Sequence, residues 1–235
     1  MDKKIKILAI SPNKTGVGYY RSINPHVFMD EEYSDKTDIT ILDKFDLNDP
    51  NFGKGFDIIH FHASQNVNLK EFVPFMKNLQ YNGTKFVMDL DDYWYLPTYF
   101  PMYDSYNVKG KVHERIITLL ELVDAATTTT DIFAKEISKH NKNVFVIPNA
   151  IDSRERQFKN ETKKSNRLRV GIICGSSHEK DIELLSGLVN KLQSDMDKLQ
   201  FVICGFDLNG SVPFQNPKTG KIEHRPIMPH ETVWY

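Results

Sequence analysis

The segment TKFVMDLDD (residues 84–92) sets the fold of this chain. Its apolar run, Phe86 to Met88, predicts a buried strand, and Asp89, Asp91 and Asp92 follow at once. Ligands of an open α/β sheet bind beyond the carboxyl ends of the strands. Because buried carboxylates without partners are costly, these acids are expected in a wet cleft or against basic groups.

Apolar runs like this one alternate with helical patterns along the whole chain. Six strands are expected first, at residues 4–10, 37–42, 56–62, 84–90, 124–130 and 143–150. Helices are expected between them, at 19–29 (interrupted by Pro25), 68–80, 110–123 and 131–140. Strands that alternate with helices predict βαβ units and a mostly parallel sheet covered on both faces.

The pattern stops at a charged segment and then restarts. Residues 152–167 carry many charges and few apolar side chains, which is typical of a linker. A strand, a helix and a strand are expected at 168–174, 182–196 and 199–205, and a long loop or hairpin at 207–226. The sequence therefore predicts an α/β protein with a Rossmann-like domain at 1–151, a linker, and the first part of a second Rossmann-like domain at 168–235.

Composition narrows the class of protein. The 235 residues are 40% hydrophobic and 26% charged, with a formal net charge of −1, so the basic excess of a nucleic-acid binder is missing. We expect no nucleic-acid partner. No apolar run approaches the ~18 residues of a membrane span. The N-terminus lacks the pattern of a signal peptide. With two cysteines and no disulfide framework, the expected compartment is the cytoplasm.

Two short motifs leave alternatives open. Gly16 and Gly18 precede a helix start, where backbone N–H groups can approach an anion, but a tight loop without a ligand fits equally well. His60 and His62 share one side of a strand, an arrangement that suits a metal. A zinc site needs further ligands, and the sequence offers no convincing one, so no metal is predicted; a buried hydrogen-bonded histidine beside one at the cleft is the simpler interpretation.

The acidic segment also allows several interpretations. Asp89 and Asp91 would share a face, with Asp92 on the other. The acids could hold a divalent cation and a nucleotide diphosphate, or act as acid and base on a sugar or phosphate. They could instead cap a turn while the aromatic residues Tyr93, Trp94 and Tyr95 fill the core. The functional interpretation predicts Asp91 and Asp92 in the cleft between the two units, with an aromatic ring beside them to stack on a sugar.

Six segments taken in order resemble retaining glycosyltransferases of the GT-B fold, in the large group-1 family. They are KIKILAISPNKTGVGYYRSINP (4–25), DIIHFH (57–62), FVMDLDDYWY (86–95), VDAATTTTDIFAKEI (123–137), VFVIPNAID (144–152) and VGIICGSSHEKDIELL (170–185). The resemblance covers nearly the whole chain. It implies an acceptor-binding first domain, a donor-binding second domain, and a nucleotide-sugar donor with a carbohydrate, lipid or protein acceptor. A nucleic acid would be a partner only as a glycosylated substrate.

The resemblance also implies roles for particular residues. Gly16 and Gly18 would approach the donor, while His62, Asp91 and Asp92 would form the catalytic side that faces the acceptor. The diphosphate would lie against residues of the second unit, namely Gly175, Ser176, His178 and Lys180. Basic side chains and helix N-termini would replace a metal ion, and no cofactor is expected besides the donor substrate.

Departures from the family pattern support a rival interpretation. Ser176 stands where the family usually has an arginine, and the family's Glu-x7-Glu segment would lie downstream of Tyr235, so the chain looks truncated within the donor domain. The alternative is therefore an inactive GT-B domain that acts as a carbohydrate-binding or partner-binding module. A downstream segment containing Glu-x7-Glu would favour the enzyme.

Overall fold

The computed structural model describes residues 3–14, 16–100, 102–155, 158–159, 166–173, 178, 181, 188–196, 198–204, 211–215 and 222–226. The chain forms two compact units, Met1–Lys159 (unit 1) and Asn160–Tyr235 (unit 2). Both units have α/β character in their described parts, and unit 1 carries the Rossmann-like sheet that the alternating sequence pattern predicts.

Unit 1 is built on six parallel strands in the order β2-β1-β3-β4-β5-β6. They are β1 (Ile5–Ile10), β2 (Thr37–Leu42), β3 (Ile58–His62), β4 (Lys85–Leu90), β5 (Ala125–Thr128) and β6 (Val144–Val146). The chain steps outward from β1 to β2 and then returns to β3 on the other side of β1. This reversal makes the carboxyl ends of β1 and β3 the topological switch point, where sheets of this type bind ligands.

Six helices of unit 1 connect these strands in the described residues. They are η1 (Gly18–Ile23), α1 (Asn24–Tyr33), α2 (Leu69–Tyr81), η2 (Asp104–Lys109), α3 (Val112–Leu122) and α4 (Asp131–Ile137). Side-chain caps begin two of them: Asn68 accepts a hydrogen bond from the Lys70 N–H at α2, and Thr130 accepts one from the Phe133 N–H at α4.

Pro25 does not interrupt the first helix, contrary to the sequence-based expectation. It occupies the second position of α1, and the turns before it widen into the π-helix η1. Proline lacks an N–H and its ring clashes with the carbonyl four residues earlier in a regular α-helix. The wider turns relieve this conflict at Arg21, and such turns are common at functional sites.

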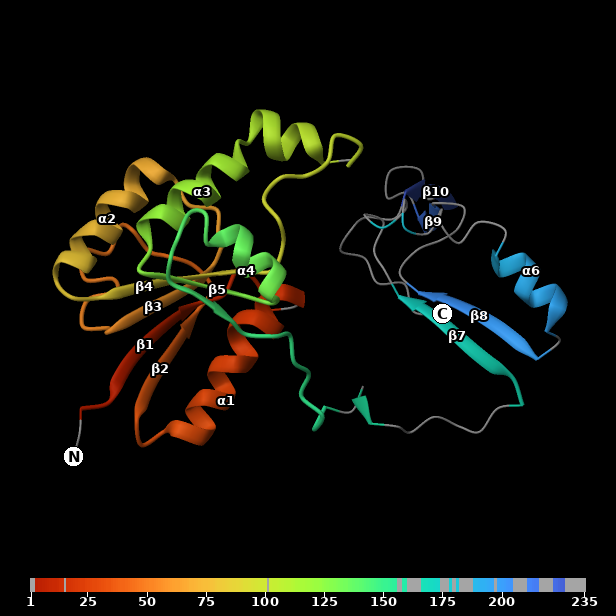
Figure 1. The fold of residues 1–235 in the computed structure, drawn as a ribbon, viewed down its shortest axis with the longest axis horizontal. Coiled ribbons are helices and arrows are strands. Elements are labelled where there is room, and N and C mark those ends of the chain that lie inside the picture. The colour runs from red at the N-terminus through yellow and green to blue at the C-terminus, as the bar shows by residue number, and fades with distance from the viewer. Residues whose placement is uncertain are drawn as a thin grey trace. The chain divides into compact units, whose positions relative to one another are not determined.

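The two faces of the sheet differ in chemistry. Right-handed crossovers that run in one direction place α2, α3 and α4 on one face, while the reversed step from β1 to β2 places α1 on the other (Figure 1). The face toward α1, which we call the polar face, carries His60, His62, Asp89 and Thr127 in register. The opposite, apolar face carries Leu8, Ile10, Ile59, Phe61, Phe86, Met88 and Leu90, all almost fully buried.

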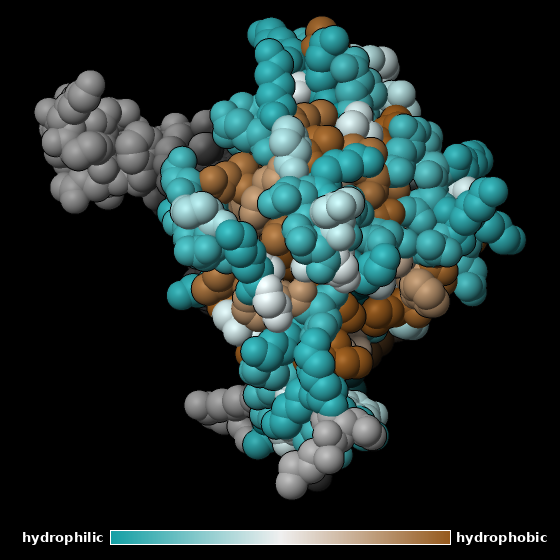
Figure 2. Space-filling model, turned by 90° about the vertical axis from the view of Figure 1, so that its left-hand side faces the viewer, coloured by the Kyte–Doolittle hydropathy of each residue, from teal (hydrophilic) through white to brown (hydrophobic). Residues whose placement is uncertain are grey.

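Aromatic rings dominate the core on the apolar face. Phe61, Phe72 and Phe86 are completely buried and pack edge to face, with ring centroids 5.7 Å apart for Phe61 and Phe72. Trp94 joins this core at 2% exposure. On the face of the molecule in Figure 2, hydrophilic residues surround smaller hydrophobic areas. Scattered apolar residues of this kind are normal on soluble proteins.

Unit 2 repeats the α/β pattern on a smaller scale in its described residues. The parallel strands β7 (Leu168–Ile173) and β8 (Leu199–Cys204) pair along their length, and α6 (Leu188–Asp195) precedes β8. The strands β9 (Ser211–Gln215) and β10 (Ile222–Pro226) pair antiparallel, so the turn-rich segment forms a hairpin rather than a loop. Among the helices described, none has the length and apolar content needed to cross a membrane.

Candidate functional site

A pocket of about 320 Å³ opens at the carboxyl edge of the unit 1 sheet. Three chain segments meet around it: the start of the first helix, the residue after β4 that begins the acidic turn, and the segment after β6. Its lining consists of Val17, Tyr20, Arg21, Asp91, Asn149, Ala150 and Ile151. The pocket therefore combines a cation, a carboxylate, an amide and apolar surface, which suits a polar organic ligand.

A buried ion pair forms the base of this site. Arg21 donates from Nε and Nη2 to the two carboxylate oxygens of Asp89, over 3.0 and 2.6 Å, and both side chains are almost fully buried. Thr127 donates a further hydrogen bond of 2.6 Å to Asp89. Asp89 is thus fully engaged inside the protein, and its role is to hold the first helix on the polar face.

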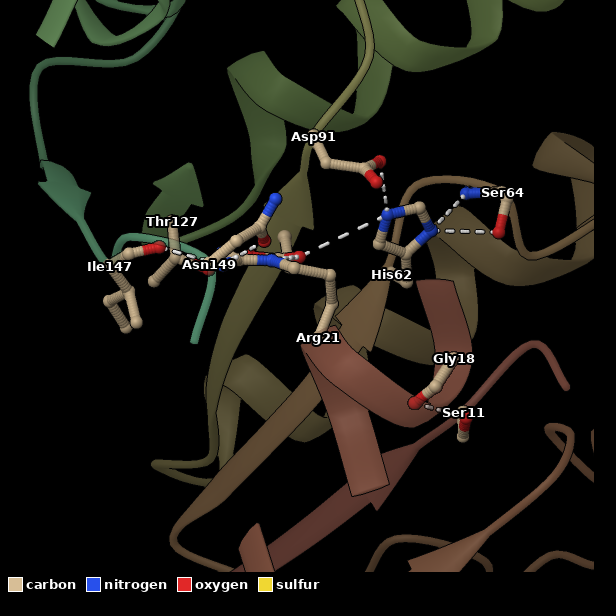
Figure 3. Close-up of polar contacts among 10 residues, drawn as sticks. Ser11, Gly18, Arg21, His62, Ser64, Asp91, Thr127, Ile147 and Asn149 are labelled. Atoms are coloured by element: carbon tan, nitrogen blue, oxygen red, sulfur yellow. Dashed lines mark hydrogen bonds and ion pairs between the residues drawn. The ribbon is translucent and has the colours of Figure 1, made fainter. Parts of the chain in front are cut away.

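Arg21 also links the first helix to the segment after β6. Its Nη1 donates to the carbonyl oxygen of Ile147 over 2.7 Å and to Oδ1 of Asn149 over 3.2 Å (Figure 3). One guanidinium therefore sets the spacing between two walls of the pocket. The fork of donors on arginine fits this task, because it can bind a carboxylate and two further acceptors at fixed angles.

His62 orients Asp91 through a defined tautomer. The backbone N–H of Ser64 donates to His62 Nδ1 over 3.1 Å, and the Ser64 hydroxyl lies 2.7 Å from the same atom. In a neutral imidazole Nδ1 is then the acceptor and Nε2 carries the proton. His62 Nε2 consequently donates to Asp91 Oδ1 over 3.0 Å, as Figure 3 shows.

Asp91 is held as a carboxylate at the pocket wall. Burial alone would raise its pKa, but the hydrogen bond from His62 and the positive charge of Arg21 lower the pKa below its ordinary value. An ionised carboxylate retains capacity for further hydrogen bonds. Asp91 can therefore accept a hydrogen bond from a ligand hydroxyl.

The remaining acidic and aromatic residues separate from one another. Asp92 is exposed and does not line the pocket. Trp94 is buried and packs on Phe133, with centroids 5.8 Å apart, so it belongs to the core. Tyr93 and Tyr95 are about half exposed, at 47% and 48%, and rings of this kind can stack on a ligand from the surface.

The two loop glycines serve different purposes. A Cβ on Gly18 would lie 2.1 Å from the carbonyl oxygen of Asn13, so this glycine permits contact within the chain itself. Gly16 has a φ of +48°, a conformation that glycine adopts easily, and the space around its missing Cβ is open. Of the two, Gly16 is the one that leaves room for another molecule.

Most residues of the predicted donor side in unit 2 are not described by the structure. Gly175, Ser176 and Lys180 lie outside the described residues. His178 is exposed, and its Nδ1 lies 2.8 Å from Oδ2 of Asp181. This distance is the side-chain contact that the described residues provide at the predicted diphosphate site.

The histidine pair agrees in part with the expected buried, hydrogen-bonded histidine beside one at the cleft: His62 is the hydrogen-bonded one, to Asp91 at the pocket wall. His60 is buried, and its Nδ1 has no hydrogen-bond partner among the described residues. Its ring lies against His26, with centroids 4.8 Å apart, and burial holds the pKa of both histidines below the ordinary value. Within the described ranges, no group of three or more His, Cys, Asp or Glu side chains is arranged for a metal ion.

Tyr20 and Arg21 are among the pocket residues that sequence reasoning does not identify. Arg21 is an isolated basic residue, and its partner Asp89 lies 68 positions away. The sequence feature that could have identified Arg21 is its position three residues after Gly18, at the start of a helix near the carboxyl edge of the sheet. Comparison with models of known families and with curated proteins finds no match to this chain.

Proposed function

We propose that this chain is the acceptor-binding unit and part of the donor-binding unit of a retaining, metal-independent glycosyltransferase that uses a nucleotide sugar. The observation that carries the proposal is the ionised Asp91, oriented by His62 at the wall of a pocket on the switch-point edge. Such a carboxylate can bind and align a sugar hydroxyl as it approaches the anomeric carbon of the donor.

The surroundings of Asp91 support this chemistry. The pocket adds the amide of Asn149 and the phenol of Tyr20, both of which can hydrogen-bond sugar hydroxyls. Arg21 brings positive charge to the same wall, although Asp89 already compensates most of it. Positive charge and an open glycine loop at Gly16 are features that favour an anionic donor close by.

The rival function is a carbohydrate-binding module without transferase activity. It is favoured by one observation: every residue that lines the pocket belongs to unit 1, so binding there needs no group from unit 2. The two functions share a ligand class and differ in whether a nucleotide sugar is bound and consumed.

Saturation-transfer NMR on the full chain tests both functions with UDP-glucose, GDP-mannose and free monosaccharides. The transferase predicts nucleotide-sugar binding, and release of nucleotide when an acceptor sugar is added. Asp91→Asn should weaken acceptor use far more than nucleotide binding. Binding of monosaccharides without nucleotide-sugar binding would establish the module instead, and no binding of either class would reject both proposals.

A further inference from the structure

Apolar side chains form the larger part of the wall of the pocket at Asp91. Four of its seven lining residues present an aliphatic side chain or an aromatic ring to it, namely Val17, Tyr20, Ala150 and Ile151. The other three are Arg21, Asp91 and Asn149. Ligand pockets commonly combine apolar walls with a few polar groups that fix the orientation of the ligand.

The three polar residues of the pocket are already partly used within the chain. Arg21 donates from Nε, Nη1 and Nη2 to other groups of unit 1, and it is only 5% exposed. Asp91 accepts from His62 on Oδ1 and retains acceptor capacity on Oδ2. Asn149 accepts from Arg21 on Oδ1, which leaves its NH₂ group as a donor (Figure 3). From these three residues a ligand can therefore use one carboxylate oxygen and one amide NH₂ group.

Ile151 places a large apolar side chain in water beside these polar groups. It lines the pocket and is nevertheless 60% exposed. Its segment is fixed by Arg21, which donates to the carbonyl oxygen of Ile147 over 2.7 Å and to Oδ1 of Asn149 over 3.2 Å. A ligand group that covers Ile151 removes apolar surface from water, and this favours binding.

The start of the first helix adds a second apolar surface to the pocket. Val17 and Tyr20 both line it. The ring of Tyr19 packs edge to face on Tyr20, with centroids 5.2 Å apart and an angle of 85° between the planes, and the Tyr19 hydroxyl donates to Glu155. A supported aromatic ring of this kind offers apolar contact area to an alkyl or aryl group of a ligand.

We propose that the acceptor bound in this pocket is a glycoside with an apolar aglycone. The hydroxyls of its sugar bind the Asp91 carboxylate and the Asn149 amide. Its alkyl or aryl aglycone covers Val17, Tyr20 and Ile151. Such a ligand is polar at one end and apolar at the other, as the lining of the pocket is. The term acceptor rests on the proposed function, but binding of the glycoside itself needs no transfer step.

Matched pairs of glycosides test this proposal on the full chain. Each pair is the methyl and the phenyl β-glycoside of one sugar, with glucose, galactose and mannose used in turn, and saturation-transfer NMR titrations give the dissociation constants. The phenyl glycoside should bind about tenfold more tightly than its methyl partner, because binding strengthens roughly in proportion to the apolar area removed from water. Its phenyl protons should receive the strongest saturation. Equal affinities within every pair, or no binding of any glycoside, would overturn the proposal.

Two exposed isoleucines provide a matched pair of variants that locates the aglycone. Ile151→Ser should weaken binding of the phenyl glycoside by about fivefold and leave the methyl glycoside nearly unchanged, since it removes apolar contact area alone. Ile132→Ser is the control, because Ile132 of α4 is 79% exposed and does not line the pocket. Asp91→Asn should weaken both glycosides by a similar factor. Equal responses to Ile151→Ser and Ile132→Ser would show that the aglycone binds elsewhere and would overturn the proposal.

The same titrations, with the nucleotide sugars added, separate this proposal from the proposed function. Nucleotide-sugar binding without a preference for phenyl glycosides would support the transferase and reject the apolar aglycone. A preference for phenyl glycosides that depends on Ile151, without nucleotide-sugar binding, would support the glycoside site and reject the transferase.

Discussion

The two faces of one sheet show two ways of attaching helices. On the apolar face, α2, α3 and α4 pack on a continuous layer of buried phenylalanine and aliphatic side chains. On the polar face, the helical segment of η1 and α1 is attached by Arg21 and by the contact of its own His26 with His60 of the sheet. The polar face is therefore organised around positioned polar groups, and the candidate site lies where these groups reach the carboxyl edge of the sheet.

Topology explains why the polar groups gather on that side. The crossovers from β3 to β6 all run in one direction and place three helices, α2, α3 and α4, on the apolar face. The first crossover, from β1 to β2, runs in the opposite direction and places α1 on the polar face. A face with less apolar cover offers polar side chains access to water near the strand ends. Charged and hydrogen-bonding residues there can bind a ligand. They replace less buried apolar surface than the same residues would on the apolar face.

Removing the cation of the polar face should have the largest effect on stability. Arg21→Met leaves Asp89 as a buried charge without its main partner, which we expect to lower the free energy of unfolding by about 3–5 kcal/mol. Urea unfolding reports this through Trp94 fluorescence in a Trp234→Phe background. The double variant Arg21→Met/Asp89→Leu should recover much of the loss. A single-variant loss below about 1 kcal/mol would show that the pair does not hold the helix.

A truncation on the apolar face should act through volume rather than charge. Met76 is completely buried, and Met76→Ala should cost about 3 kcal/mol by leaving a cavity. Met76→Leu keeps the volume and should cost about 1 kcal/mol or less. The same urea measurement at pH 5.5 and 7.5 should give equal losses. A loss that changes with pH would remove the distinction between the two faces.

The buried histidines predict a pH dependence confined to the polar face. Burial lowers the pKa of His60 first of all, and the charges of His26, His62 and Arg21 add to the effect. The unfolded chain takes up protons below its pKa of ~6.5 while the folded His60 stays neutral. The contribution of His60 to the free energy of unfolding is therefore fully present above pH 6.5. It declines as the pH falls, by up to ~1.4 kcal/mol at pH 5.5.

Unfolding of His60→Gln at pH 7.5 and 5.5 checks this origin. The variant should lose less stability between the two values than wild type does, whereas His140→Gln, on the opposite side of the sheet, should behave like wild type. Asp57, Asp91 and Asp124 have lowered pKa values, so the stability they contribute is lost only below pH ~4, outside this window. An unchanged pH response in His60→Gln would assign the effect elsewhere.

The apolar face was the predictable part of the molecule. The observed bounds of β2 match the expected 37–42, and β4 begins one residue later than expected. Runs and alternations of apolar residues predict strands of this kind from local sequence alone. The hairpin at 211–226 was one of two stated alternatives, because turn residues mark a reversal without giving the strand register.

The polar face was predictable only in part. The acidic run identified the ligand edge, and His62 and Asp91 do meet there. The run did not show that Asp89 is used by Arg21, that Asp92 is exposed outside the pocket lining, or that Trp94 joins the core. These outcomes depend on contacts between distant segments and on the π-turns before Pro25, neither of which leaves a periodic signal in the sequence.

The smallest expected effect concerns the outer side of α1. The expected linker begins at residue 152, but unit 1 extends to Lys159, and Arg154 packs its guanidinium 4.1 Å from the centre of the Phe28 ring. Arg154 also binds Glu31 over 3.1 Å and Asp152 over 3.0 Å, and Tyr19 donates to Glu155, which raises the pKa of that phenol to about 12. The segment therefore packs on α1 through Phe28 and Glu31.

Arg154→Gln should therefore loosen the segment while leaving the sheet intact. Exposed ion pairs contribute about 1 kcal/mol or less, so the free energy of unfolding should change little. Limited proteolysis should nevertheless cut faster between residues 152 and 167, because the anchored part of that stretch becomes accessible. Lys135→Gln, at an exposed position on α4, serves as the control and should leave the cleavage rate unchanged. Two results would contradict this prediction: equal cleavage rates in both variants, or preferred cleavage between residues 40 and 120. Either would mean that only contacts with the sheet stabilise α1 and that the segment after β6 does not.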